Sequence, residues 1–188
     1  MNKYLILVKH SLPEIEQDQP AREWHLSNQG MERARRLATQ LTAYRPEVLV
    51  SSAEPKARET AEILAELLGL QVHVKQDLHE HDRSETGFLS KEQFQKAIQE
   101  FFLNPAEPVF GKETADEAHS RFSKAMHSVL ETHDNQTAVV VAHGTVISLF
   151  VSRLLGISDY ALWNELGLPG FVVLDMTSKK LVTQENIL

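Results

Sequence analysis

Two histidines stand just beyond two apolar runs of the chain, where a catalytic pair is commonly placed. His10 follows the run from Tyr4 to Val8, and His143 follows the run from Ala138 to Ala142. Such runs are typical of strands buried on both faces, and in parallel sheets the ligand crevice lies beyond the carboxyl ends of the strands. We therefore expect both imidazoles to face one pocket. The alternative is two unrelated histidines on separate loops.

The elements that would position these histidines alternate along the chain. Strand-like runs cover Tyr4 to Val8, Val48 to Ser51, Val72 to Val74, Ala138 to Ala142 and Phe171 to Leu174, and helical patterns lie between them. Strands alternating with helices indicate a layered α/β domain. We expect a three-layer sandwich with a mostly parallel central sheet and helices on both faces.

Local signals predict where several helices begin and end. The predicted boundaries are a start after Ser27, an end at Gly69, a helix from Ser90 to Phe102, and a start at Thr114 with Glu117 completing a capping box. The segment from about 80 to 112 is less regular than the rest. We expect it to form a lid or insert over the site.

Composition limits the kind of protein. The chain has 188 residues, no cysteine and a formal net charge of -7. This length suits one domain over residues 1–188, and the negative charge argues against general nucleic-acid binding. Zero cysteines exclude disulfides and thiolate metal sites. The chain contains no long apolar segment, so we expect a cytoplasmic protein with no membrane partner. The oligomeric state stays open.

Four short polar segments carry a family resemblance. They are Lys9-His10-Ser11, the stretch from Ser51 to Arg58, the stretch from Leu78 to His81, and Ala142-His143-Gly144. Their order and surroundings resemble the histidine phosphatase superfamily, the phosphoglycerate-mutase-like group, from Tyr4 to about Leu155. Two further segments support the resemblance: residues 26–30 before the first helix, and Gly111-Lys112-Glu113-Thr114.

The resemblance implies roles for individual residues. His10 takes the place of the nucleophile in the Arg-His-Gly motif, Glu80 that of the acid/base, and His143 that of the second histidine. Lys9 and Lys56 stand where the family pattern has arginines. The residues then expected at the substrate phosphate are Lys9, Ser11, Lys56, Arg58 and Gly144, with Arg22 and Arg83 in reserve.

This set of residues suits phosphoryl transfer. A neutral imidazole can attack phosphorus to give a phosphohistidine, nearby cations stabilise the phosphate oxygens, and Glu80 would protonate the leaving alcohol. The scheme requires no cofactor and no metal. Although His79, His81 and Asp82 flank Glu80, their spacing does not put them on one helical face, so we expect no metal site. The expected partner is a small phosphorylated substrate or phosphate.

The two lysines leave several functions open. Arginine grips two phosphate oxygens with a planar fork, whereas lysine is a mobile point charge. The leading prediction is a metal-independent phosphatase that hydrolyses a phosphomonoester through phosphorylated His10. The alternatives are a catalytically weak or inactive phosphate-binding or regulatory module, a phosphomutase, and a structural protein without a pocket.

Overall fold

The computed structural model describes residues 3–188 and contains one six-stranded sheet in the order β3-β2-β4-β1-β5-β6. The strands are β1 (Tyr4–Lys9), β2 (Val48–Ser51), β3 (Val72–Val74), β4 (Ala138–Ala142), β5 (Gly170–Asp175) and β6 (Lys180–Asn186). The first four are parallel to one another, and β5 and β6 are antiparallel to their neighbours. The predicted mostly parallel sheet is confirmed.

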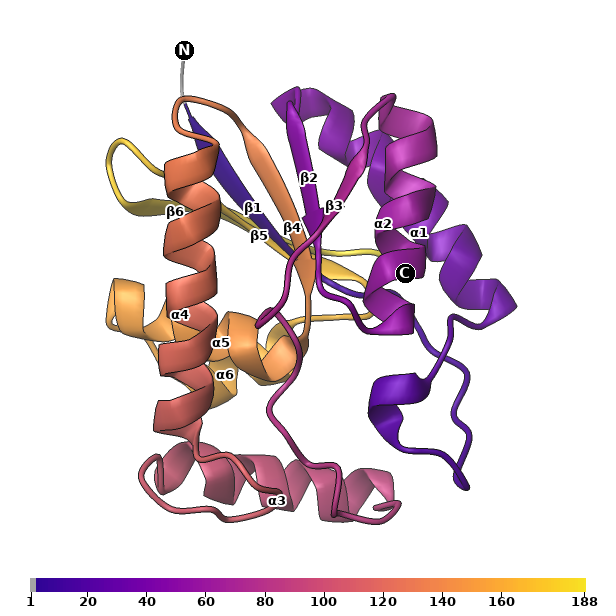
Figure 1. The fold of residues 1–188 in the computed structure, drawn as a ribbon, viewed down its shortest axis with the longest axis vertical. Coiled ribbons are helices and arrows are strands. Elements are labelled where there is room, and N and C mark those ends of the chain that lie inside the picture. Colours follow the sequence, from indigo (N-terminus) through magenta and orange to yellow (C-terminus); the bar gives the residue numbers. More distant parts are fainter. Residues whose placement is uncertain (1–2) are drawn as a thin grey trace.

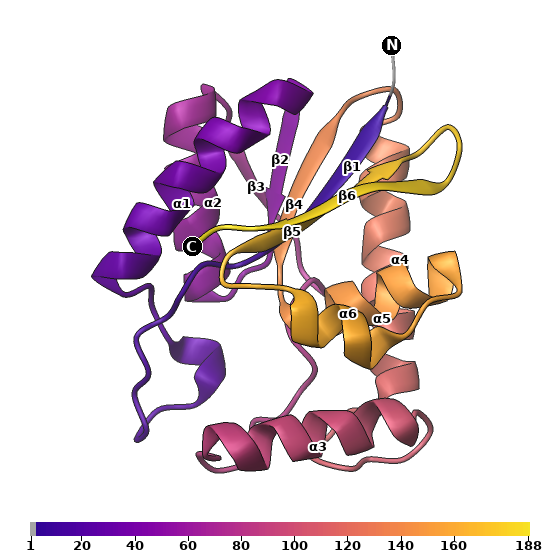
Figure 2. The ribbon, with the colours of Figure 1, turned by 180° about the vertical axis from the view of Figure 1, so that it is seen from behind.

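Helices cover both faces of this sheet (Figures 1 and 2). The α-helices are α1 (Asn28–Leu41), α2 (Pro55–Leu68), α3 (Lys91–Leu103), α4 (Ala115–Thr132), α5 (Gly144–Leu155) and α6 (Asp159–Glu165), and two short 3-10 helices are η1 (Ala21–Glu23) and η2 (Thr42–Tyr44). Helices α1 and α2 pack on one face, and α4, α5 and α6 pack on the other. This is the expected three-layer sandwich.

The alternation of side chains along the strands explains the two cores. In β1, Leu5 and Leu7 join the cluster under α4 and α5, whereas Ile6 and Val8 join the cluster under α1 and α2. Because successive strand residues point to opposite faces, a fully apolar strand is needed where both faces are covered. The apolar runs seen in the sequence therefore mark the central strands.

Capping side chains set the helix boundaries as predicted. Ser27 accepts a hydrogen bond from the backbone N–H of Gly30, and Thr114 forms a reciprocal capping box with Glu117. Gly69 ends α2 in the left-handed conformation at φ 67°. Such caps satisfy backbone groups that have no partner within the helix.

Strand β6 was not predicted. Its sequence is largely polar, and both of its faces are mostly exposed because it forms the outer edge of the sheet beside β5. An exposed edge strand shows little of the apolar pattern that marks a buried strand. The pairing with β5 therefore comes from tertiary structure rather than from hydrophobic periodicity.

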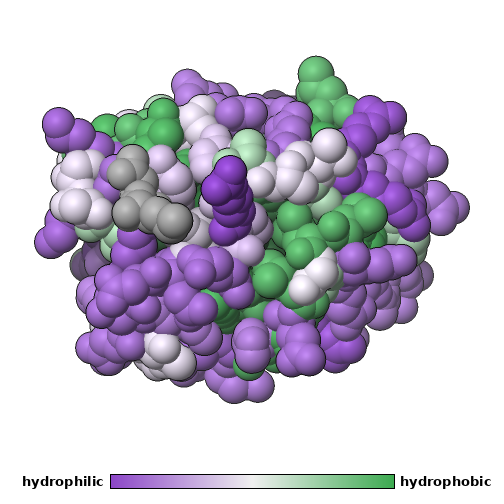
Figure 3. Space-filling model, turned by 90° about the horizontal axis from the view of Figure 1, so that it is seen from above, coloured by the Kyte–Doolittle hydropathy of each residue, from purple (hydrophilic) through white to green (hydrophobic). Residues whose placement is uncertain are grey.

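The segment 80–112 holds α3 and the loops on either side of it. Figures 1 and 2 show α3 lying across the end of the molecule toward which the parallel strands run. The opposite end, seen in Figure 3, is mostly hydrophilic, with hydrophobic side chains in several separate places. None of the helices within residues 3–188 has both the length and the apolar character required to cross a membrane.

Candidate active site

The two histidines lie side by side at the carboxyl ends of two adjacent strands. Strands β1 and β4 are paired in parallel with Lys9 opposite Ala142, and the backbone N–H of His10 donates a 3.0 Å hydrogen bond to the carbonyl oxygen of Ala142. The rings of His10 and His143 are 5.2 Å apart between centroids. Both residues are buried. The structure therefore brings the two imidazoles together, as expected.

His10 has one ring nitrogen free for attack. Its Nδ1 lies 2.8 Å from the carbonyl oxygen of Ser11, which can only accept, so Nδ1 carries the hydrogen and the lone pair is on Nε2. Burial, reinforced by the nearby charges of Lys56 and His143, holds the pKa of His10 well below its usual value. The imidazole is therefore neutral at physiological pH, as a nucleophile must be.

His143 contacts the segment that precedes α2. Its Nε2 lies 2.9 Å from the hydroxyl oxygen of Ser52 and 3.6 Å from Oε1 of Glu54. Burial lowers the pKa of His143 to about 4, and the Glu54 carboxylate opposes this shift. The Nδ1 atom is buried and has no hydrogen-bond partner among the described residues. A buried unsatisfied nitrogen of this kind is free to bond a ligand.

Lys9 is held by residues of α6 and its C-cap. Its Nζ donates a 2.8 Å hydrogen bond to the carbonyl oxygen of Leu166 and lies 5.8 Å from the ring centroid of Trp163. Burial lowers the pKa of Lys9 to about 8, with the charge of Glu80 acting in the other direction. A Cβ atom at Gly144 would lie 3.0 Å from Cε of Lys9, so the glycine leaves room for this side chain.

Lys56 projects from the first turn of α2 and is only 4% exposed. Its Nζ donates to the carbonyl oxygen of Ala21 at 2.6 Å and to Oε2 of Glu54 at 2.5 Å. The first bond ties the loop that follows His10 to the site. The second pairs Lys56 with a carboxylate to which sequence analysis assigned no role.

Glu80 is oriented by two backbone donors. The N–H of Thr145, in the first turn of α5, donates to Oε2 at 3.1 Å, and the N–H of His81 donates to Oε1 at 3.0 Å. Burial alone would raise the pKa of Glu80, but interactions with His81, His143 and Arg83 outweigh it and hold the pKa well below the usual value. Glu80 is thus ionised in the substrate-free protein.

Arg121 of α4 fixes the backbone that carries Glu80. Its guanidinium donates to the carbonyl oxygens of Asp77, His79 and Glu80 at 2.8, 3.0 and 3.2 Å. It is also bound to Glu113 through two contacts of 2.8 Å. The resemblance at residues 111–114 pointed to Glu113, but no local pattern indicated its partner on α4.

The remaining predicted phosphate ligands have different surroundings. Ser11 is fully buried, its hydroxyl donates to the carbonyl oxygen of Gly30 at 2.7 Å, and its N–H donates to Thr60. Both donors of Ser11 are therefore used within the fold. Arg58 is on the exposed side of α2, where its guanidinium contacts Glu62 at 3.2 Å. The structure does not bring Arg58 to the two histidines.

Of the two reserve arginines, Arg83 lies beside the site. Its guanidinium carbon is 4.4 Å from the ring centroid of Phe94. Burial lowers the pKa of Arg83, and the charges of Glu80 and Glu54 oppose that shift. No hydrogen bond from the Arg83 side chain is found within residues 3–188. Arg22, in contrast, has a largely exposed side chain that contacts Glu23.

Aromatic side chains connect the segment 80–112 to the site. Phe94 of α3 lies edge-on to Trp163 of α6, and Phe101 and Phe110 enclose the ring of His81 at 4.6 and 4.7 Å. Phe101 is fully buried, whereas Phe88 is 48% exposed. Most of these phenylalanines therefore form a core beneath α3.

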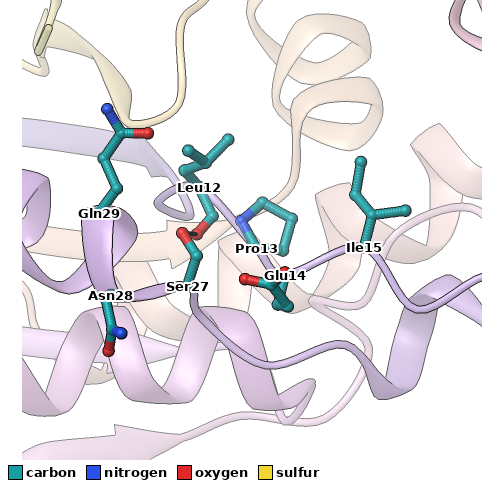
Figure 4. A pocket seen from close by; sticks show the side chains of 7 residues that line it. All are labelled: Leu12, Pro13, Glu14, Ile15, Ser27, Asn28 and Gln29. Atoms are coloured by element: carbon teal, nitrogen blue, oxygen red, sulfur yellow. Dashed lines mark hydrogen bonds between the residues drawn. The ribbon is translucent and has the colours of Figure 1, made fainter.

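A separate groove lies beside the loop that follows His10 (Figure 4). It has a volume of about 520 Å³ and is lined by Leu12, Pro13, Glu14, Ile15, Ser27, Asn28 and Gln29. Gly30 explains the close approach of α1 here, because a Cβ at this position would lie 2.0 Å from the carbonyl oxygen of Leu12. The residues that line the groove do not include the two histidines, the two lysines or Glu80 of the candidate site.

The histidine, lysine and glutamate side chains form an asymmetric set. The set comprises one neutral histidine with an unprotonated Nε2, two ammonium groups held by backbone carbonyls, and the two buried carboxylates of Glu54 and Glu80. Within residues 3–188, no group of three or more His, Cys, Asp or Glu side chains is arranged to hold a metal ion.

Comparison with known proteins identifies the family. Residues 5–185 match the histidine phosphatase superfamily (branch 1), and the chain belongs to that superfamily. It is 29% identical over 168 residues to phosphoserine phosphatase 1 of Hydrogenobacter thermophilus, a match that covers 85% of this chain and 80% of the relative.

Solved structures show the same fold. A protein described as mycobacterial hydrolase 1 matches with a TM-score of 0.80 and 22% identity, and the match covers 100% of both chains. A mutant phosphoserine phosphatase from Entamoeba histolytica in complex with phosphoserine matches with a TM-score of 0.78 and 18% identity, covering 97% of this chain and 96% of the other.

Proposed function

We propose that this protein is a metal-independent phosphatase that hydrolyses a small phosphomonoester through a phosphohistidine on His10. The observation that supports this most directly is the state of His10, which is neutral, buried and fixed by the Ser11 carbonyl with Nε2 unprotonated. The charges of Lys56, His143 and Lys9 act on His10, and that of Glu80 acts on Lys9 and His143, so these groups form one electrostatically coupled cluster. Membership of the superfamily supports the same chemistry.

In the first step, Nε2 of His10 attacks phosphorus and the bond to the leaving alcohol breaks. Lys9, Lys56 and His143 stabilise the negative charge on the phosphate oxygens. Because Glu80 is ionised before substrate binds, its proton arrives with a monoanionic substrate. Glu80 passes this proton to the leaving oxygen, which departs as the alcohol.

In the second step, Glu80 takes a proton from a water molecule as the water oxygen attacks the phosphohistidine. The bond between nitrogen and phosphorus breaks, and its electron pair returns to Nε2 of His10. Inorganic phosphate leaves with the proton. The hydrogen on Nδ1 stays bonded to the carbonyl of Ser11 throughout.

Phosphoserine is the first natural substrate to test. The relative from Hydrogenobacter thermophilus and the similar structure from Entamoeba histolytica are both described as phosphoserine phosphatases, the latter in complex with phosphoserine. The side of the site nearest Glu80 is bordered by Arg83, which has no anionic hydrogen-bond partner within the described chain. A substrate whose alcohol part carries a carboxylate would suit this surrounding.

The test is hydrolysis of para-nitrophenyl phosphate and phosphoserine by the wild type and by His10→Ala, with a chelator present. We expect chelator-resistant release of phosphate that is abolished in His10→Ala. The acid-labile phosphohistidine should be trapped from the wild type by rapid alkaline quenching. Equal activity in both proteins would refute the proposed nucleophile.

A second function is favoured by one observation. Both lysine ammonium groups already bond protein oxygens, Lys9 at Leu166 and Lys56 at Ala21 and Glu54. A site whose cations are partly satisfied would grip phosphate weakly. A catalytically weak phosphate-binding module would bind inorganic phosphate in calorimetry while releasing none from either ester.

A further inference from the structure

Glu54 contacts three parts of the proposed catalytic apparatus at once. Its Oε2 accepts the hydrogen bond from Lys56 Nζ at 2.5 Å, its Oε1 accepts from the backbone N–H of Glu80 at 2.9 Å, and the same oxygen is 3.6 Å from Nε2 of His143. We propose that Glu54 is a positioning residue that fixes Lys56, Glu80 and His143 for phosphoryl transfer. This inference rests on the function proposed above.

The conformation at the start of α2 makes Glu54 available for this role. Glu54 is the N-cap of the helix, yet its side chain forms no capping hydrogen bond. Instead the carboxylate turns into the site, where it is 11% exposed. A buried carboxylate is costly unless it is paired and fully hydrogen-bonded. Here both of its oxygens have partners.

The first effect concerns the direction of the Lys56 ammonium. An ammonium group has three donors on a flexible stem, so by itself it orients a phosphate less well than a guanidinium does. Two of these donors are taken by Glu54 and by the Ala21 carbonyl. The third N–H donor of Lys56 therefore points in one fixed direction. Glu54 thus provides an orientation that lysine lacks.

The second effect concerns the placement of Glu80. The carboxylate of Glu80 is held by Thr145 and His81, but its own backbone N–H is held by Glu54. The Glu54 side chain therefore links Lys56 on α2 to Glu80 on the loop that follows β3. Displacing a catalytic group by about 1 Å is enough to cost about 100-fold in rate.

The third effect concerns the proton on His143. The groups that act on this ring are Glu54 and Glu80, which favour the charged form, and Lys56 and His79, which disfavour it. His10 adds a further ring at 5.2 Å. The negative charge of Glu54 thus favours an imidazolium at His143 when a phosphate is bound, and an imidazolium stabilises the oxygens of the transferring group.

The experiment compares Glu54→Gln with the wild type and with Glu62→Gln as the control. Glu62 is on the same helix, is exposed and is ion-paired with Arg58. Glutamine keeps the shape of Glu54 but removes its charge. Four measurements are made on each protein: steady-state hydrolysis of para-nitrophenyl phosphate, calorimetry with inorganic phosphate, thermal melting, and NMR titration of labelled histidines in the phosphate complex.

We expect Glu54→Gln to lower kcat by about tenfold or more while phosphate binds as tightly as before or more tightly. The phosphate affinity is kept because the removed charge of Glu54 repelled the phosphate. The kcat falls because the removed contacts of Glu54 oriented the catalytic groups. The His143 resonance in the phosphate complex should titrate at lower pH. In a Lys56→Met background the effect on kcat should shrink, since coupled residues are not additive. Glu62→Gln should match the wild type.

Three results would overturn the proposal. They are an unchanged or raised kcat in Glu54→Gln, a weakened phosphate affinity together with a lowered melting temperature, and an equal loss in the Lys56→Met background. Failure of the proposed function is distinguishable, because the wild type would then release no more phosphate than His10→Ala. In that case the His143 titration decides whether Glu54 positions these groups around a bound phosphate: a downward shift of the His143 resonance in the phosphate complex supports it and no shift refutes it.

Discussion

The ammonium group of Lys9 donates a 2.8 Å hydrogen bond to the carbonyl oxygen of Leu166, so the end of α6 determines where the charge beside His10 lies. The two residues are far apart in the chain. Lys9 ends the first strand, and Leu166 is the C-cap of a short helix near the carboxyl terminus. The contact fixes the position of the buried Lys9 ammonium.

Lys9 should set the basic limb of the pH profile. Its pKa, lowered by burial to about 8, means that the ammonium loses its charge as pH rises through about 8. We expect kcat/KM to fall above that pH in the wild type. In Lys9→Arg the charge persists, so the fall should move to higher pH. The control is Lys112→Arg, because Lys112 is exposed and paired with Glu85. Its kcat/KM should fall at the same pH as that of the wild type. An identical limb in Lys9→Arg would refute this assignment.

Gly144→Ala should impair the site without unfolding the protein. The added Cβ would lie 3.0 Å from Cε and 3.3 Å from Nζ of Lys9, so the flexible lysine must move by a few tenths of an ångström. We expect kcat/KM to fall by about tenfold while the melting temperature changes little. Gly87→Ala is the control, because a Cβ there meets nothing within 4 Å. An unchanged kcat/KM would show that Lys9 has room to spare.

Arg83 should contribute to substrate binding, whereas Arg58 should not. Arg83 rests on Phe94 and faces the charges of Glu80 and Glu54, but Arg58 is bonded to Glu62 on the exposed side of α2. We expect Arg83→Leu to raise KM for phosphoserine by about tenfold to 100-fold and Arg58→Leu to leave it within about twofold. Steady-state kinetics at constant pH give both values. The reverse order would favour the Arg58 assignment that sequence alone suggested.

The buried histidines should make the fold sensitive to acid. The pKa of His143 is about 4 in the folded protein and 6.5 as the ordinary value, so the unfolded chain binds more protons between these limits. The contribution of His143 to the free energy of unfolding is therefore fully present above about pH 6.5 and is lost as pH falls toward 4. His10, whose pKa is also lowered, acts in the same direction.

Urea denaturation across this pH range measures the effect. The free energy of unfolding should decline steadily from pH 6.5 to pH 4 in the wild type, and less steeply in His143→Asn. His127 is exposed, so His127→Asn should retain the wild-type slope. Equal slopes in all three proteins would show that His143 does not dominate this dependence.

Sequence alone predicted the parts of this protein that depend on local pattern. The apolar runs of β1 and β4 are buried on both faces, and this forces them into the centre of the sheet with His10 and His143 at one edge. The caps at Ser27 and Thr114 were equally readable, because a capping bond joins residues three apart.

The parts that were missed depend on contacts between distant segments. Glu54 precedes a helix and looks like a solvated polar residue in sequence, and only the packing of α2 beside β4 turns it toward His143. Arg121 lies on α4 among other polar residues, and nothing nearby in the chain shows that it reaches residues 77–80. Likewise, Arg58 and Lys56 are two positions apart, but the helix turns them in different directions.

The clamp formed by Arg121 limits how this enzyme could be re-engineered. Loop grafting is an obvious way to alter its selectivity, with residues 77–83 taken from a relative. Because the three carbonyls of that segment are gripped from α4, a transplanted loop would need the same backbone path beneath Arg121 and Glu113. A successful chimera would therefore exchange the loop and the first two turns of α4 as one unit.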